Sequence, residues 1–155
     1  MRLLFKIAAV VFVLDQLTKW FVVQYLNLAA RGEIDVLPPI LNLRMAWNRG
    51  INFGLLSGDQ ESTKWILIAI AVMISAWVIW WMRRETRLLA HISAGLLVGG
   101  AIGNIVDRLI YGAVADFLNM SCCGFDNPYA FNIADITIFI GAFGLILFTG
   151  EQKKA

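Results

Sequence analysis

Four long apolar segments constrain the fold of this chain more than any other feature of its sequence. They lie at about residues 4–26, 65–82, 88–110 and 131–149, and a helix of this length crosses about 30 Å of hydrocarbon. Of the 155 residues, 59% are hydrophobic and only 15% are charged. A soluble core of this size could not bury so much apolar surface. We therefore expect one domain, residues 1–155, that is an all-α membrane protein with four transmembrane helices.

Basic residues in the short flanks predict the orientation of these helices, because Lys and Arg accumulate on the cytoplasmic side. They lie before the first segment, between the second and third, and after the fourth: Arg2, Lys6, Arg83, Arg84, Arg87, Lys153 and Lys154. We expect both termini in the cytoplasm and the loops 27–64 and 111–130 at the outer face. The net charge of +2 reflects this topology, and nothing predicts a nucleic-acid partner.

The first outer loop has the pattern of a small β-structure. Residues 41–45 alternate apolar and polar side chains, as a half-exposed strand does. Pro38-Pro39 breaks the segment before it, and Asn48-Arg49-Gly50 can turn the chain into residues 51–53. We expect a small β-containing region on the outer membrane face; an irregular loop resting on lipid headgroups is the alternative.

The third segment combines a glycine stripe with polar side chains. Glycines recur at every fourth residue from Gly95 to Gly103, and Asp107 continues the stripe. Small residues let helices approach closely, but packing does not explain the carboxylate. Asn104 and Arg108 lie four apart on the adjoining face. This end of the helix is either part of a functional site or a structural hydrogen-bond network.

Two further acids flank a charge-poor stretch between the third and fourth segments. Asp116 and Asp135 should face each other at the same surface of the bilayer, where carboxylates are costly and usually functional. Two nearby carboxylates repel each other, so one retains a proton at intermediate pH. The ionised partner can then activate a water and the protonated partner can act as an acid. This chemistry needs no metal or cofactor.

Three other polar sites support more modest interpretations. Asp15 and Lys19, four residues apart in the first segment, can pair with each other, and we favour a supporting role over direct chemistry. Asn132 lies three residues before Asp135, as either a helix cap or a substrate contact. His91 is the only histidine and should lie near the cytoplasmic end, so neither a Ser-His-Asp triad nor a histidine-rich zinc site is expected.

Five ordered motifs give the chain a family resemblance. They are Asp15-Gln16-Leu17-Thr18-Lys19, Asn48-Arg49-Gly50 with Phe53-Gly54, Gly99-Gly100-Ala101-Ile102-Gly103-Asn104 with Asp107-Arg108, Val114-Ala115-Asp116-Phe117 and Phe131-Asn132-Ile133-Ala134-Asp135. Together they resemble the motifs of lipoprotein signal peptidase, also called signal peptidase II. The resemblance implies an aspartic endopeptidase of the bacterial cytoplasmic (inner) membrane. Its substrates would be prolipoproteins, cut before a diacylglyceryl-modified cysteine that membrane lipids help to hold.

The resemblance also assigns roles to residues. Asp116 and Asp135 become a catalytic dyad. Asn48, Asn104, Arg108 and Asn132 become pocket or substrate-positioning residues. The full set that we expect to bind or support the substrate also includes Asp15, Lys19, Gly50 and Asp107. The adjacent Cys122 and Cys123 lie outside the motifs, are poorly placed for an ordinary disulfide, and are weak candidates for a nucleophile without a nearby histidine.

Two other classes of protein compete with the peptidase. A proton- or ion-coupled transporter would use Asp15, Asp107, Asp116 and Asp135 as a relay, and should carry acids at graded depths. The last three cluster toward the outer face, which favours a one-sided enzyme. An assembly or scaffold protein would explain the glycines but not the acids.

Overall fold

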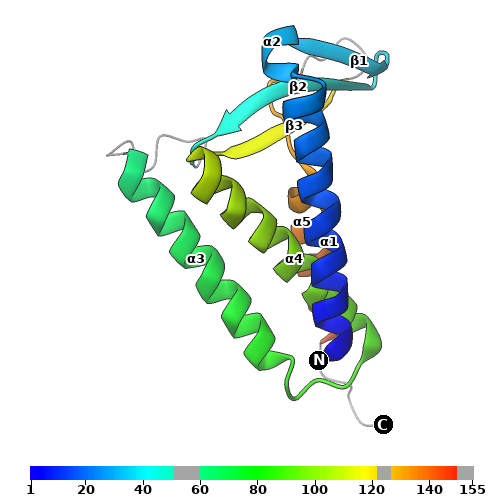
Figure 1. The fold of residues 1–155 in the computed structure, drawn as a ribbon. Helices are drawn as coiled ribbons and strands as arrows, with labels where there is room; N and C mark the ends of the chain where they lie inside the picture. Colours follow the sequence, from blue (N-terminus) through cyan, green and yellow to red (C-terminus); the bar gives the residue numbers. More distant parts are fainter. Residues whose placement is uncertain (51–59, 122–126, 150–155) are drawn as a thin grey trace.

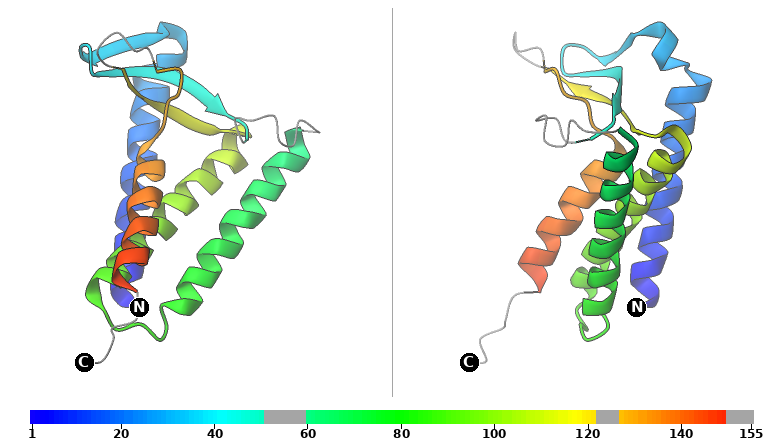
Figure 2. Two further views of the ribbon diagram at one scale, coloured as in Figure 1. Left: turned by 180° about the vertical axis from the view of Figure 1, so that it is seen from behind. Right: turned by 90° about the vertical axis from the view of Figure 1, so that its left-hand side faces the viewer.

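Four long helices and a small sheet make up the computed structural model, which describes residues 1–50, 60–121 and 127–149. The helices are α1 (Arg2–Trp20), α3 (Gln60–Trp81), α4 (Leu88–Tyr111) and α5 (Ile133–Phe148). The sheet lies across the end of the helices opposite the N-terminus (Figure 1), and the two views of Figure 2 agree on this arrangement. The α3–α4 connection lies at the same end as the N-terminus.

The predicted helices are present, with shifted ends. α1 continues into the π-helical turn η1 (Phe21–Tyr25), and the short helix α2 (Leu28–Arg31) follows after the non-helical residues Leu26 and Asn27. α3 begins at Gln60, before the predicted residue 65, because its polar first turn is also helical and contains Glu61, an acid favoured by the helix dipole. α5 begins at Ile133, two residues later than predicted, because Asn132 caps it.

Among the residues that the structure describes, three helical segments are long and apolar enough to cross a membrane: Arg2–Tyr25, Glu61–Trp81 and Leu88–Tyr111. α5 is apolar but has only 16 residues, a length of roughly 24 Å. Its outer surface carries exposed apolar side chains such as Phe139 and Ile146, as contact with lipid requires. The chain is therefore a membrane protein, and the count of four spans stays a prediction.

Glycines allow α4 to pack closely between α1 and α5. A Cβ atom at Gly99 would lie 2.6 Å from the Ala8 carbonyl oxygen of α1, and one at Gly100 would lie 2.6 Å from Thr137 Oγ1 of α5. From α5, a Cβ at Gly141 would lie 2.6 Å from the Leu97 amide nitrogen. The predicted small-residue stripe is thus a packing face toward α1, and Gly100 and Gly141, outside the stripe, allow the close contact with α5.

The apolar core divides between the two ends of the molecule. Far from the sheet, one cluster joins α1, α3, α4 and α5; it contains Leu4, Ala8, Val78, Met82, Ala90, Ala94, Leu97, Val98 and Leu145. A smaller cluster of Val22, Leu28 and Phe117 supports the sheet. The polar residues of interest lie between these two clusters, where α1, α4 and α5 approach the sheet.

The sheet is antiparallel, with the order β1 (Glu33–Leu37), β2 (Leu41–Asn48) and β3 (Val114–Met120). The predicted strand at 41–45 is confirmed as part of β2, whose neighbours are β1 and β3; the expected turn into residues 51–53 lies outside the described residues. The 111–130 segment, predicted to be a loop, contains β3. Its residues Val114 to Phe117 are all buried, so the period-two alternation that reveals a half-exposed strand is absent.

Candidate active site

β3 and the first turn of α5 bring Asp116 and Asp135 together. Asp116 lies opposite Ala46 of β2 and is only 3% exposed, whereas Asp135 is half-buried. Asn132 links the two: its Nδ2 donates to Asp116 Oδ1 at 2.6 Å, and its backbone N–H donates to Asp135 Oδ2 at 3.3 Å. One residue therefore contacts both carboxylates.

Asn132 is also the N-cap of α5. Its Oδ1 accepts the Asp135 backbone N–H at 2.9 Å, and the reciprocal bond to the Asp135 carboxylate completes a capping box. Of the two interpretations of Asn132, the helix cap is confirmed, and the substrate contact stays a prediction. Because the same side chain donates to Asp116, the cap also fixes the relative positions of the two acids.

Side-chain amides supply further hydrogen bonds to each acid. Asn48 Nδ2 donates to Asp116 Oδ2 at 3.1 Å, and the Gly50 backbone N–H orients that amide by donating to its Oδ1 at 3.2 Å. On the other side, Asn104 Nδ2 donates to Asp135 Oδ1 at 2.8 Å. The predicted residues Asn48, Gly50 and Asn104 thus all lie at the acidic pair.

The environment of Asp116 favours its protonated form. Burial, and next the negative charge of Asp135, raise the pKa of Asp116 to about 6, although hydrogen bonds from Asn48 and Asn132 partly oppose the rise. A carboxyl group with such a pKa can gain or lose a proton near neutral pH. Asp116 therefore has the electrostatics that general acid–base catalysis requires.

A buried ion cluster lies next to the acidic pair. Lys19 Nζ is 2.8 Å from both Asp15 Oδ2 and Asp107 Oδ2, and all three side chains are at most 3% exposed. The predicted Asp15–Lys19 pair is confirmed, and Asp107 is a second partner. Lys19 also donates to Asn104 Oδ1 at 3.2 Å, so one hydrogen-bonded network joins the cluster to Asp135.

Gln16 belongs to this cluster and was not singled out in the sequence. Its Nε2 donates to Asp15 Oδ2 at 3.2 Å and to Asp107 Oδ1 at 3.1 Å. The sequence did contain a sign of this role, because Gln16 is an amide next to the Asp15–Lys19 pair in an otherwise apolar helix. Both carboxylates therefore receive bonds from two residues of α1.

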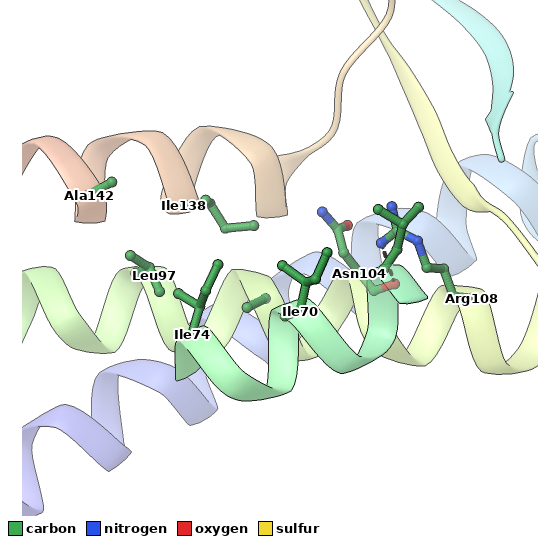
Figure 3. Close-up of a pocket in the computed structure, with 10 residues that line it drawn as sticks. Ile70, Ile74, Leu97, Asn104, Arg108, Ile138 and Ala142 are labelled. Atoms are coloured by element: carbon green, nitrogen blue, oxygen red, sulfur yellow. Dashed lines mark hydrogen bonds between the residues drawn. The ribbon is translucent and has the colours of Figure 1, made fainter. Parts of the chain in front are cut away.

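An apolar pocket of about 390 Å³ lies between α3, α4 and α5. Its lining residues are Leu67, Ile70, Ala71, Ile74, Leu97, Ala101, Asn104, Arg108, Ile138 and Ala142. Figure 3 shows the polar side chains of Asn104 and Arg108 together at one end of it. Arg108 Nη1 donates to the Asn104 backbone oxygen at 3.2 Å. Because Asn104 also binds Asp135, the pocket leads to the acidic pair.

A second, more polar pocket of about 190 Å³ opens at Asp116. Ala46, Trp47 and Asn48 line it from β2, and residues 128–130 line its other side. Asn119, which sequence analysis missed, supports that side by donating to the backbone oxygens of Asn127 at 2.6 Å and Tyr129 at 2.8 Å. An asparagine in an unrecognised strand gave no signal of this role.

The remaining candidates lie elsewhere. His91 is near the start of α4, at the end away from the sheet, with its Nδ1 3.0 Å from the Arg87 backbone oxygen. Cys122 and Cys123 lie outside the described residues. Within residues 1–50, 60–121 and 127–149, no group of three or more His, Cys, Asp or Glu side chains is arranged to hold a metal ion.

The fold and the site together define a membrane protein with two adjoining carboxylates beside an apolar pocket, and comparison with known proteins makes this class specific. The family model described as signal peptidase (SPase) II matches residues 7–150. Lipoprotein signal peptidases of Methylobacterium sp. strain 4-46 and Rhodopseudomonas palustris strain CGA009 are 42% and 45% identical to the chain. The alignments cover 92% and 88% of the chain, respectively, and 85% of each relative.

Solved structures agree with this result. Two structures described as bacterial membrane enzymes superimpose with TM-scores of 0.76 and 0.78, at 28% and 30% sequence identity, over 96% of this chain and 92% of theirs. The chain belongs to the signal peptidase II family, as its five motifs predicted. It is therefore a protease.

Proposed function

We propose that this protein is an aspartic endopeptidase that removes signal peptides from bacterial prolipoproteins, cutting before a diacylglyceryl-modified cysteine. Asp116 and Asp135 are the dyad. The observation that carries the proposal is their joint contact with Asn132, together with the raised pKa of Asp116. Relatives described as lipoprotein signal peptidases support the choice of substrate.

The proposed reaction uses one proton shared by the dyad. The ionised carboxylate accepts a proton from water as the water oxygen bonds to the scissile carbonyl carbon, and the protonated partner donates toward the carbonyl oxygen. As the C–N bond breaks, a dyad carboxyl group gives its proton to the leaving amine. The products are a new carboxyl terminus and a new amino terminus, and no step needs a metal ion.

The apolar pocket between α3, α4 and α5 supports a substrate that is itself embedded in lipid. Apolar side chains line most of the pocket, and Asn104, which binds Asp135, lies at one end of it. Acyl chains on the substrate cysteine add about 0.8 kcal/mol of membrane attachment per buried methylene. They would hold the scissile bond at the depth of the dyad, which favours reaction by proximity.

The proposed location is the bacterial cytoplasmic (inner) membrane, with the site at the outer face. The sheet and the N-terminus lie at opposite ends of the helices. Arg2 and Lys6 lie at the N-terminal end and Arg83 and Arg84 at the α3–α4 connection of that same end. The tendency of basic residues to stay in the cytoplasm therefore supports a cytoplasmic N-terminus. The last basic residues, Lys153 and Lys154, lie outside the described part of the chain.

The substrate proposal is tested with one peptide in two forms, with and without the diacylglyceryl group. Both forms are presented to the purified protein in the same bilayer at matched membrane-bound concentrations. We expect strong preference for the lipid-modified form, and equal cleavage of both would contradict lipid-dependent positioning. Ion flux measured in the same liposomes tests the competing transporter, which would move ions and leave both peptides intact.

The proposed sidedness is tested by cysteine labelling in a background without Cys122 and Cys123. A single cysteine replaces either Asn48 or Arg84, and an impermeant reagent is applied to intact cells or spheroplasts. We expect labelling at position 48 alone. Labelling at position 84 alone would place the dyad on the cytoplasmic side.

A further inference from the structure

Each proposed catalytic aspartate follows an alanine whose backbone amide is held by the buried ion cluster. The Ala115 N–H donates to Asp107 Oδ2 at 3.1 Å, and the Ala134 N–H donates to Asp15 Oδ1 at 3.0 Å. Both bonds are buried. The residue that precedes Asp116 is therefore anchored to one carboxylate of the cluster, and the residue that precedes Asp135 is anchored to the other.

Lys19 connects the two anchors. Its ammonium group lies 2.8 Å from each anchoring carboxylate, so a single atom limits how far Asp15 and Asp107 can separate. It also donates to Asn104, which binds Asp135 directly. Hydrogen bonds between charged groups are shorter and stronger than neutral ones, which makes this connection stiff.

We propose that Lys19 is a positioning residue that sets the spacing between Asp116 and Asp135 through the backbone amides of Ala115 and Ala134. The inference rests on the proposed dyad and explains how the spacing of its two carboxyl groups is maintained. Acid–base catalysis demands that both carboxyl groups reach the same water and carbonyl group, and a displacement of about 1 Å can reduce the rate about a hundredfold.

A purely structural cluster is the competing explanation. The close α1–α4 contact also depends on Gly95 and Gly99, which lie away from the cluster. These glycines should keep α1 packed against α4 when Lys19 is lost, so the two roles of Lys19 can be measured separately. A structural role would lower the amount of folded protein and leave the turnover number of the folded fraction unchanged, whereas a positioning role lowers that turnover number.

The first test compares Lys19→Met and Lys19→Arg with the unaltered full-length chain in the same bilayer. In folded Lys19→Met protein, kcat should fall about tenfold to a hundredfold, while KM changes little because Lys19 does not line the apolar pocket. Lys19→Arg keeps the charge and should recover part of the loss. Unchanged kcat in folded Lys19→Met protein would overturn the proposal.

Arg87→Met provides the matched control. Arg87 Nη1 donates to the Phe148 backbone oxygen at 2.6 Å and so joins the start of α4 to the end of α5. Arg87 is the N-cap of α4, and the α3–α4 connection lies at the end of the helices opposite the sheet. This variant also loses a cation that connects two elements. Arg87→Met should be less stable than the unaltered protein but have the same kcat. An equal fall in kcat in Lys19→Met and Arg87→Met would show that general destabilisation causes the effect and would overturn the proposal.

A second test keeps every charge and side chain in place, so it also decides the matter where Lys19→Met does not fold. Incorporation of lactic acid in place of Ala115 or Ala134 turns the amide into an ester, which removes the donating N–H and weakens the preceding carbonyl oxygen as an acceptor. The same exchange at Ala94, within α4, is the control. We expect each site-proximal ester to lower kcat about tenfold or more; control-like kcat in both would overturn the proposal.

Dyad variants in the same assay separate this inference from the proposed function. Turnover by folded Asp116→Asn or Asp135→Asn protein would refute the dyad itself. If both variants are inactive while Lys19→Met and the two esters retain full kcat, the dyad survives and only the positioning role fails.

Discussion

Two pairs of aspartates share one hydrogen-bonded network, yet their neighbours differ. Asp15 and Asp107 lie on either side of the Lys19 ammonium. For Asp116 and Asp135, the donors that the structure describes are amides, including those of Asn48, Asn104 and Asn132. The first pair is at most 1% exposed, whereas Asp135 is half-buried and Asp116 borders a pocket.

The comparison shows how a protein can use the same side chain for support and for chemistry. A cation between two carboxylates offsets their repulsion and makes the pair a rigid connection. Amides orient carboxylates without adding a full charge, so repulsion persists and contributes to the raised pKa of Asp116. The neighbours, more than the acids themselves, thus distinguish the pair that we propose to exchange protons from the pair that supports it.

The largest effect should come from neutralising the amide-held pair. Asp116→Asn and Asp135→Asn should each reduce cleavage about a thousandfold or more, because an amide cannot exchange a proton with water or the leaving amine. Peptide cleavage and thermal unfolding are measured together, with Asp35→Asn on exposed β1 as control. Normal turnover by folded Asp116→Asn protein would remove the distinction between the pairs.

Asp15→Asn should act mainly on stability. It leaves Lys19 with one carboxylate and should lower the free energy of unfolding by about 3 kcal/mol. The asparagine oxygen can still accept the Ala134 N–H, so cleavage per folded molecule should fall by less than about tenfold. Denaturation in micelles measures the loss, with Glu61→Gln as control, because Glu61 is the exposed partner of its ion pair with Lys64. Equal losses of stability in the two variants would show that burial of the cluster adds nothing.

Asn132 offers a way to separate its two roles. Asn132→Ser keeps an N-cap oxygen but loses the amide that donates to Asp116, whereas Asn132→Ala loses both. Both variants should lower kcat similarly, while the alanine variant should be about 1 kcal/mol less stable than the serine variant. Single-turnover kinetics and unfolding measure the two effects. Full activity of Asn132→Ser would restrict this residue to capping.

The smallest effect should be a shift in pH dependence. As pH rises through about 6, Asp116 of the free protein loses its proton, so kcat/KM should decline on the alkaline side. The Asn48 hydrogen bond lowers the pKa of Asp116; removing it in Asn48→Ala should therefore move the decline to higher pH. Asn42→Ala, on the same strand, is the control. A shift to lower pH would contradict the assigned electrostatics.

Hydropathy predicted the helices well because lipid requires long apolar segments. The predicted segment 88–110 corresponds to α4, Leu88–Tyr111. β3 was missed because its first four residues are buried on both faces, so no alternation marks the strand. The late start of α5 depends on the extended backbone of Asn132, with φ −132° and ψ 179°, which hydropathy does not register.

The polar residues of the site could be found because each interrupts an apolar segment or belongs to a motif. Their connections could not be found in the same way. Lys19 bonds to Asn104, 85 residues further along the chain, and such a contact depends on how the helices pack. Ala115 and Ala134 contribute only backbone amides, and their side chains carry no chemical signal.

The distribution of the ion cluster along the chain has a consequence for biogenesis. Asp15 and Lys19 are partners within α1, so this helix can enter the bilayer as an electrically balanced unit. The side-chain partners that the structure describes for Asp107 are Lys19 and Gln16, and both belong to α1. When α4 leaves the translocation machinery, the helix that carries these side-chain donors has already been inserted, and the order of synthesis thereby favours correct helix association over premature release into lipid.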